Sequence, residues 1–160
     1  MATVSSRTVA INAAFLQEIK LDNTTLRGLL ESIRRLVGQS WTKQAQATRF
    51  TLLLGELRDQ LAMHFTLEEA FGYYEDAVAQ APQLCERAQV LRGQHAELFT
   101  ELCMLVDEAE ESVVSYLPLE RWSHRQIVAF RRFDRRLREH EQDETELIFA
   151  AFDDDLGVGD

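Results

Sequence analysis

Three histidines and two glutamates in this 160-residue chain are spaced so that they could bind a metal ion. They form two matched pairs and one single position: His64 with Glu68, His140 with Glu144, and His95. A spacing of four residues places both side chains of a pair on the same face of a helix. Imidazole nitrogens suit metals such as iron and zinc, and a carboxylate can bridge two ions. The pattern therefore favours a metal site between helices.

The same five residues stand in otherwise apolar helical stripes. One such stripe runs through Phe50, Leu54 and Leu61 before it reaches His64. Burying polar side chains there costs free energy unless they find partners. A buried hydrogen-bond network of these residues with Asn23 and water is therefore the alternative to a metal.

Four segments carry the alternating three- and four-residue spacing that is typical of amphipathic helices. We expect helices over residues 8–38, 47–80, 82–115 and 123–152, followed by an acidic, solvated tail over residues 153–160. Ser123 is the expected N-cap of the last helix, just after a loop that contains Pro118. Because short connections make sequential helices antiparallel, the sequence predicts an all-α, up-down-up-down four-helix bundle, a single domain over residues 1–160. A coiled-coil homo-oligomer is the architectural alternative.

The polar positions of the four expected helices fall at similar heights. Each lies roughly 13 to 24 residues from its flanking turns, which in an antiparallel bundle places them within about two helical turns of one another. In the first helix this position is Asn23, whose side chain we expect to be at most a weak or outer ligand. Independent core histidines would have no reason to share one height, so the coincidence favours a common site. His124, the fourth histidine, lies outside this level.

Composition and charge limit the partners of the chain. A formal net charge of -10 argues against nucleic acid and anionic membranes as partners. No apolar stretch reaches the roughly 18 residues of a membrane span, and residues 1–9 lack a signal-peptide layout, so we expect a cytoplasmic protein. Cys85 and Cys103 would lie roughly 27 Å apart on one helix, too far for a disulfide, and we expect free thiols.

Several of these stretches together resemble the hemerythrin-like, or HHE cation-binding, family, and the resemblance covers nearly the whole chain. The most specific match is residues 64–69, His-Phe-Thr-Leu-Glu-Glu, which is similar to the second-helix motif of a histidine and a bridging glutamate. Residues 15–23 are similar to the first-helix stretch of the family, in which an Asp-His pair stands at the end. His95, His140 and Glu144 match positions of its third and last helices.

Two positions depart from the family pattern, in which a complete di-iron site uses five histidines and two carboxylates. Asn23 stands where the first-helix histidine is expected, and Leu91 stands where a second histidine of the third helix is expected. Three histidines and two glutamates remain as candidate ligands.

The resemblance implies a non-heme metal centre formed by His64, Glu68, His95, His140 and Glu144 in the bundle core. It would hold one or two iron ions, with zinc or manganese as alternatives, and would meet O₂ or NO in sensing, redox or iron-handling roles. We expect no enzymatic activity, since the sequence adds no substrate pocket and no redox cysteine near the site; a di-iron oxidase or peroxidase is the enzymatic alternative. A further alternative is a metal-free bundle that acts as a structural or protein-interaction module.

Overall fold

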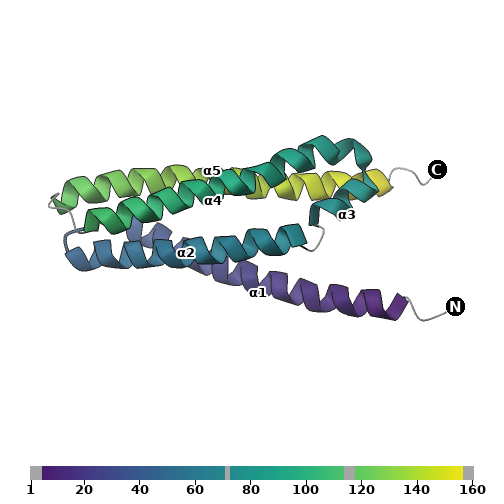
Figure 1. The fold of residues 1–160 in the computed structure, drawn as a ribbon, viewed down its shortest axis with the longest axis horizontal. Helices are drawn as coiled ribbons and strands as arrows, with labels where there is room; N and C mark the ends of the chain where they lie inside the picture. Colours follow the sequence, from purple (N-terminus) through teal and green to yellow (C-terminus); the bar gives the residue numbers. More distant parts are fainter. Residues whose placement is uncertain (1–4, 71–72, 114–117, 157–160) are drawn as a thin grey trace.

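The computed structural model describes residues 5–70, 73–113 and 118–156. Four long helices lie side by side along one axis (Figure 1): α1 (Ser5–Val37), α2 (Gln44–Ala70), α4 (Cys85–Val113) and α5 (Leu119–Leu156). A short helix, α3 (Tyr73–Gln80), and a 3-10 turn, η1 (Pro82–Leu84), lie between α2 and α4 in the chain. The described residues form no strand. The predicted all-α helical bundle is confirmed.

The segment predicted as one helix over residues 47–80 contains two helices. α2 ends at Ala70 and α3 begins at Tyr73, while residues 71–72 lie outside the described part of the chain. α3 packs against α5, and Ala77, Ala81 and Ala151 are buried together there. Such small side chains let two helices approach closely. The apolar spacing continues across the break, so it could not reveal that the helix is interrupted.

The last helix begins earlier and ends later than predicted. α5 starts at Leu119, because the carbonyl of Pro118 accepts a hydrogen bond from the N–H of Trp122 (3.1 Å). A proline is well placed there, since the first helical residues need no N–H partner. Ser123 is therefore not the N-cap; it is buried inside α5, and its hydroxyl donates to the carbonyl of Glu120 (3.0 Å).

The C-terminal tail, predicted as solvated from residue 153, is helical to Leu156. Residues 157–160 and the end of the third predicted helix, residues 114–115, lie outside the described residues.

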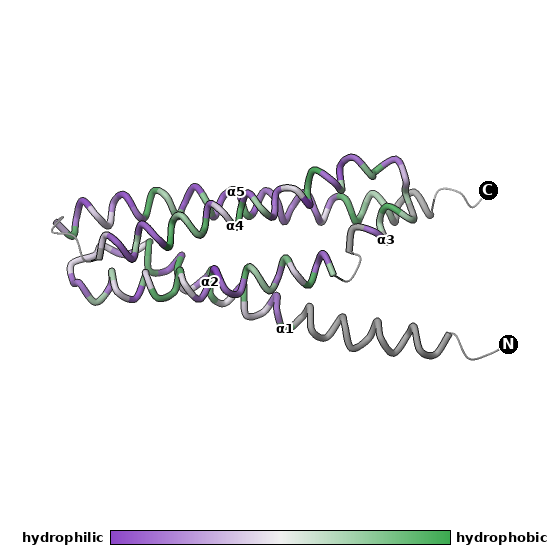
Figure 2. The backbone as a smooth tube through the Cα atoms, in the orientation of Figure 1, coloured by the Kyte–Doolittle hydropathy of each residue, from purple (hydrophilic) through white to green (hydrophobic). Residues whose placement is uncertain are grey.

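The apolar core is interrupted by a polar layer. The main core lies toward the turn between α1 and α2, where Trp41 packs on Phe50 with 5.0 Å between ring centroids. A second cluster, of Ala88, Leu91 and Leu147, packs nearer α3. Figure 2 shows hydrophobic and hydrophilic residues alternating along the helices, as expected for elements with one buried and one exposed face. In α4 and α5 the residues between the two clusters are the buried histidines and Glu144.

The four long helices do not all pack equally closely. α1 packs mainly on α2, and α5 packs mainly on α4. Arg34 of α1 reaches α5, where its Nε lies 3.0 and 3.1 Å from the two carboxylate oxygens of Asp134. Next to this ion pair a cavity of about 600 Å³ lies between α1, α2 and α5.

The outer faces of the helices are strongly charged. Arg136 of α5 pairs with Glu101 of α4 and lies 3.3 Å from Glu97, so the charge of this arginine is matched by acidic side chains. Within the described part of the chain, no helix combines the length and the apolar character that crossing a bilayer requires.

Candidate metal centre

The five residues singled out by their spacing converge in the polar layer. His64 and Glu68 come from α2, His95 from α4, and His140 and Glu144 from α5; none is more than 7 % exposed. The helical period carries this arrangement, because residues four apart project from one face. Imidazole and carboxylate groups from three helices therefore lie together in one buried layer.

The two carboxylates link the three imidazoles. Glu68 Oε1 lies 2.9 Å from His64 Nε2, and Glu68 Oε2 lies 3.4 Å from His95 Nε2. Glu144 Oε1 lies 3.3 Å from His95 Nε2 and 3.0 Å from His140 Nε2. One ligand atom from each of Glu68, His95, His140 and Glu144 lies within 4.8 Å of the others, so these four could hold one ion. His64 adjoins this group through Glu68.

Each histidine is oriented by a polar residue of the preceding long helix. In all three cases a side-chain oxygen lies within hydrogen-bonding distance of Nδ1. The pairs are His64 with Asp22 (2.6 Å), His95 with Glu69 (2.9 Å) and His140 with Gln94 (2.8 Å). A proton on Nδ1 satisfies such an acceptor and leaves Nε2, which faces the glutamates, available as a ligand. Metal-binding histidines are characteristically held in this way.

Phe65 fixes the position of one imidazole from the side of the main core. Its ring stacks on that of His95, with 4.0 Å between centroids and 8° between the planes, and it meets His140 edge-on at 5.9 Å. Phe65 also belongs to the main apolar cluster, so its ring lies where that cluster meets the polar layer. The histidines therefore have little freedom to turn away from the glutamates.

In the metal-free protein, the surrounding carboxylates favour the protonated forms of His64 and His95. Burial lowers the pKa of His64, but the hydrogen bonds and negative charges of Glu68 and Asp22 outweigh this effect and raise the pKa to about 9. Burial also lowers the pKa of His95, and hydrogen bonds to Glu144 and Glu69 reverse the shift and raise it. A metal ion would replace these protons, since a ligating imidazole must be neutral.

Two buried atoms support a metal at this place. In the described part of the chain, four buried side-chain atoms make no hydrogen bond of good geometry, and two of them, Glu68 Oε2 and His140 Nε2, belong to the candidate centre. Buried polar atoms without such a bond are rare in folded proteins and call for an explanation such as an ion. Both atoms belong to residues of the four-ligand group, so one cation there would satisfy them. The donors are nitrogen and oxygen, a set that suits iron, zinc or manganese.

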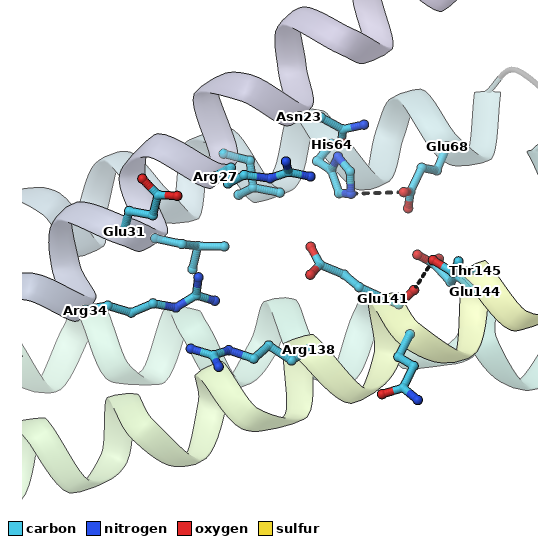
Figure 3. A pocket seen from close by; sticks show the side chains of 13 residues that line it. Asn23, Arg27, Glu31, Arg34, His64, Glu68, Arg138, Glu141, Glu144 and Thr145 are labelled. Atoms are coloured by element: carbon cyan, nitrogen blue, oxygen red, sulfur yellow. Dashed lines mark hydrogen bonds and ion pairs between the residues drawn. The ribbon is translucent and has the colours of Figure 1, made fainter.

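The contribution of α1 differs from the prediction. Asp22 of this helix is 8 % exposed, contacts His64, and accepts a hydrogen bond from Gln60 (2.6 Å). Asn23 is half-buried and lines the cavity beside His64 (Figure 3). Asp22 lies three residues after Ile19 and Asn23 lies four, so the apolar spacing alone could not show which of the two is buried. The Asp-His pair of the family motif was the signal that pointed to position 22.

Other helix-facing residues were also outside the predicted set. Glu69 contacts His95 of α4, and Gln94 contacts His140 of α5. Both stand next to an apolar stripe rather than on it, and spacing gave no signal for them. Leu91 is 2 % exposed and packs in the second apolar cluster, so it offers packing and no ligand.

One end of the centre opens into the cavity between α1 and α5. Figure 3 shows His64, Glu68 and Glu144 at this end, with arginine side chains farther along the cavity. The charged residues that line it are Arg27, Glu31, Arg34, His64, Glu68, Arg138, Glu141 and Glu144. Burial raises the pKa of the Glu141 carboxyl; the charge of His64 works against this, and the charge of Glu144 adds to it. The spacing of the sequence did not single out Glu141, because it lies off the apolar stripe of α5.

Comparison with known proteins yields one match that spans most of the chain. The model of the hemerythrin HHE cation-binding domain matches residues 14–152. No curated protein and no solved structure matches the chain.

Proposed function

The chain belongs to the hemerythrin HHE cation-binding domain family, and from this premise we propose that it binds iron in its polar layer and senses or handles O₂ or NO. The observation that carries the proposal is the buried group of Glu68, His95, His140 and Glu144, whose ligand atoms lie within 4.8 Å of one another. Zinc and manganese are the alternative metals, because the same nitrogen and oxygen donors suit them.

In the proposed centre each residue has a distinct task. His95 and His140 present Nε2, and Glu144, with one oxygen near both imidazoles, would join them at the ion. Glu68 has one oxygen toward His95 and one toward His64, which is the arrangement of a carboxylate that can bridge. Asp22, Glu69 and Gln94 keep the imidazoles in the orientation that ligation needs. Bound iron would supply an open coordination position for a small diatomic ligand.

The cavity next to His64 supports a role with a small molecule. It has a volume of about 600 Å³ and reaches Glu68 and Glu144, so O₂ or NO could approach the centre from the side of α1 and α5. A non-enzymatic role is part of the proposal; among the described residues that line this cavity, none is a cysteine.

Metal analysis of the full chain tests the proposal. Protein purified in air, and apo-protein reconstituted with Fe(II) without oxygen, should retain one or two iron ions per chain. Addition of O₂ or NO to the reduced form should change its absorption spectrum. Retention of zinc or manganese in place of iron would reject the choice of metal. A chain that binds none of the three would reject the metal centre as a whole.

Two histidine variants separate the centre from adventitious binding. His95→Gln removes one ligand of the four-residue group and should lower iron retention by at least tenfold. His124→Gln, which changes an exposed histidine of α5 outside the polar layer, should retain iron like the unaltered chain. Equal loss in both variants would contradict the assignment.

The departures at Asn23 and Leu91 favour one second candidate, a metal-free bundle that acts as a structural or interaction module. For that candidate, neither variant would change metal content, and the melting temperature would not respond to added iron, zinc or manganese.

A further inference from the structure

Two contacts anchor the last turn of α1 to α5. Arg34 Nη2 lies 2.6 Å from Asp134 Oδ1, and Arg131 Nη2 donates a hydrogen bond to the carbonyl of Val37 (3.3 Å). Toward the N-terminus of α1, the cavity of about 600 Å³ lies between the two helices. α1 is therefore held against α5 at one end and faces a cavity beyond it.

The two contacts define the register of these antiparallel helices. The two α1 residues are three apart in the sequence, and so are the two α5 residues, in the opposite direction. Both helices rise by about 1.5 Å per residue, so the same correspondence continues along the cavity. Residues of α1 and α5 that share a level can thus be identified from their positions in the sequence.

In this register, opposite charges stand at matching levels of the two helices. Arg27 of α1 shares its level with Glu141 of α5. Glu31 of α1 lies one residue, about 1.5 Å, from the level of Arg138 of α5. Steps of three and four residues keep the charged positions of each helix on one face. Mixed charges are ordinary on solvated helices, but here they alternate along both helices so that each meets its opposite.

These two facing pairs are not in contact in this structure. The side chains of both pairs line the cavity, and Figure 3 shows Arg27 on the α1 side of it and Arg138 and Glu141 on the α5 side. Among the residues that the structure describes, no ion pair joins the members of either pair. Arg138 contacts Asp134 instead (2.9 Å). The α1–α5 interface is thus closed at Asp134 and open at the next two charged levels.

We propose that α1 moves toward α5 and covers the cavity, pivoting on its anchored last turn. In the closed arrangement Arg27 pairs with Glu141. Glu31 pairs with Arg138 one step closer to the pivot. Hinge and shear movements of helices are a common form of closure in proteins. Ion pairs near the surface contribute little free energy, so the open and closed arrangements exchange readily.

The closure controls how small molecules reach the candidate centre. The cavity contains His64, Glu68 and Glu144 at one end, so narrowing it blocks the approach from the side of α1 and α5. This consequence rests on the proposed function. The closure itself rests on charge and register, and it needs no metal.

Disulfide trapping tests the closure, in the full metal-free chain with Cys85 and Cys103 replaced by serine. Arg27→Cys with Glu141→Cys places one thiol on each helix at the same level, and a disulfide forms only if the two Cα atoms come within about 7 Å. Mild oxidation followed by mass spectrometry should show this disulfide. Arg27→Cys with Thr145→Cys is the matched control. Thr145 lines the same cavity one turn away from that level, so its disulfide should form at least about tenfold more slowly.

The second facing pair tests whether charge drives the closure. With the cysteines at positions 27 and 141 in place, Glu31→Arg puts like charges at matching levels and should slow disulfide formation about threefold. Glu31→Arg with Arg138→Glu restores opposite charges and should recover most of the rate, which also shows that the variants fold. The proposal is overturned if the disulfide does not form, if the control pair forms it equally fast, or if Glu31→Arg leaves its rate unchanged.

Control of access to the centre has its own measurement. The disulfide-linked chain, loaded with Fe(II) after the link has formed, should bind NO at least about tenfold more slowly than a chain with Arg27→Ser and Glu141→Ser, which lacks the link. Equal rates would overturn the control of access. A chain that binds no iron would overturn the proposed function, and the trapping experiment would still decide whether α1 closes on α5.

Discussion

The three contacts at Nδ1 decide how firmly each imidazole faces the glutamates. In each contact, a side-chain oxygen from the preceding long helix lies within hydrogen-bonding distance of the histidine Nδ1. The contact between Gln94 and His140 is the simplest to test, because Gln94 carries no charge and its loss leaves the net charge of the layer unchanged. An imidazole released from its Nδ1 acceptor is free to rotate away from the metal.

Gln94→Leu should therefore weaken iron binding by about tenfold to a hundredfold, the usual cost of removing a residue that orients a ligand. Competition with a chelator of known affinity measures the change. Gln89→Leu is the control, since Gln89 is an exposed glutamine of the same helix that contacts Cys85 and no histidine. Unchanged affinity in Gln94→Leu would mean that the ring of His140 is fixed by Phe65 and its neighbours alone.

The raised pKa of His64 links the stability of the metal-free protein to pH. Because the pKa rises from 6.5 in the unfolded chain to about 9 in the folded one, protonated His64 stabilises the fold. This contribution is complete below pH 6.5, is lost as the pH rises to 9, and amounts to about 3 kcal/mol at roughly 1.4 kcal/mol per pKa unit. Urea unfolding of the apo-protein at both pH values should show this loss.

His64→Gln provides the comparison for the pH effect. The variant lacks the titrating group, so its stability should fall less over the same interval, and equal slopes would contradict the raised pKa. Metal affinity should follow the opposite trend in the unaltered chain. It should increase from pH 6.5 to 9, since an ion must displace the proton of His64.

At the scale of one helix, α4 divides its buried face between packing and ligation. His95 lies in the polar layer, and Leu91, one turn earlier, packs with Ala88 and Leu147. A histidine at position 91 would restore the family pattern but would place a polar ring in an apolar cluster. The departure at Leu91 therefore has a packing consequence that the motif comparison does not reveal.

Leu91→His should lower the free energy of unfolding of the apo-protein by about 2 to 3 kcal/mol, the usual cost of an unpaired polar group in a core. Leu91→Met, which nearly conserves volume, should cost less than about 1.5 kcal/mol. Urea denaturation in the presence of a chelator measures both. A Leu91→His protein as stable as the Leu91→Met protein would show that position 91 has access to polar partners.

The helices were more predictable than their ends. Repeated apolar spacing identifies each buried face, because a stripe of leucines and phenylalanines gains free energy only when it is covered. α3 packs on α5 after α2 ends at Ala70, and spacing within one segment contains no information about such contacts between helices; α5 begins at Leu119 with the local hydrogen bond from Trp122 to Pro118. Ser123 illustrates this limit, since its sequence neighbourhood suits an N-cap but Trp122 and the carbonyl of Pro118 already begin the helix there.

From the sequence, only the site residues that lie on the apolar stripes of the helices could be predicted. His64, Glu68, His95, His140 and Glu144 interrupt apolar runs, and an interruption is visible in a sequence. Asp22, Glu69, Gln94 and Glu141 stand beside the stripes, where polar residues are ordinary. Their importance arises from which neighbouring helix they face, and that is a property of the assembled bundle.

At the scale of the whole molecule, the polar layer joins three helices directly and the fourth indirectly. α2, α4 and α5 supply the candidate ligands, while α1 takes part through Asp22, which contacts His64. In addition, Arg34 of α1 forms an ion pair with Asp134 of α5, across the cavity from the centre. Binding of an ion in the polar layer should therefore stabilise α2, α4 and α5 more than α1.

Hydrogen exchange of the apo and iron-loaded protein tests this difference. At a free metal concentration of about 100 times Kd, binding stabilises the fold by about 2.7 kcal/mol, which corresponds to a rise in Tm of roughly 5 to 10 °C for a chain of this size. Protection should increase most in the amides around His64, His95 and His140, and least in α1, because α1 supplies no candidate ligand of the four-residue group. Protection confined to α1, or a rise in Tm without added protection in α4 and α5, would show that the metal binds elsewhere on the molecule. The ratio of free metal to Kd thus sets the size of the stabilisation, and the positions of the candidate ligands predict its distribution over the helices.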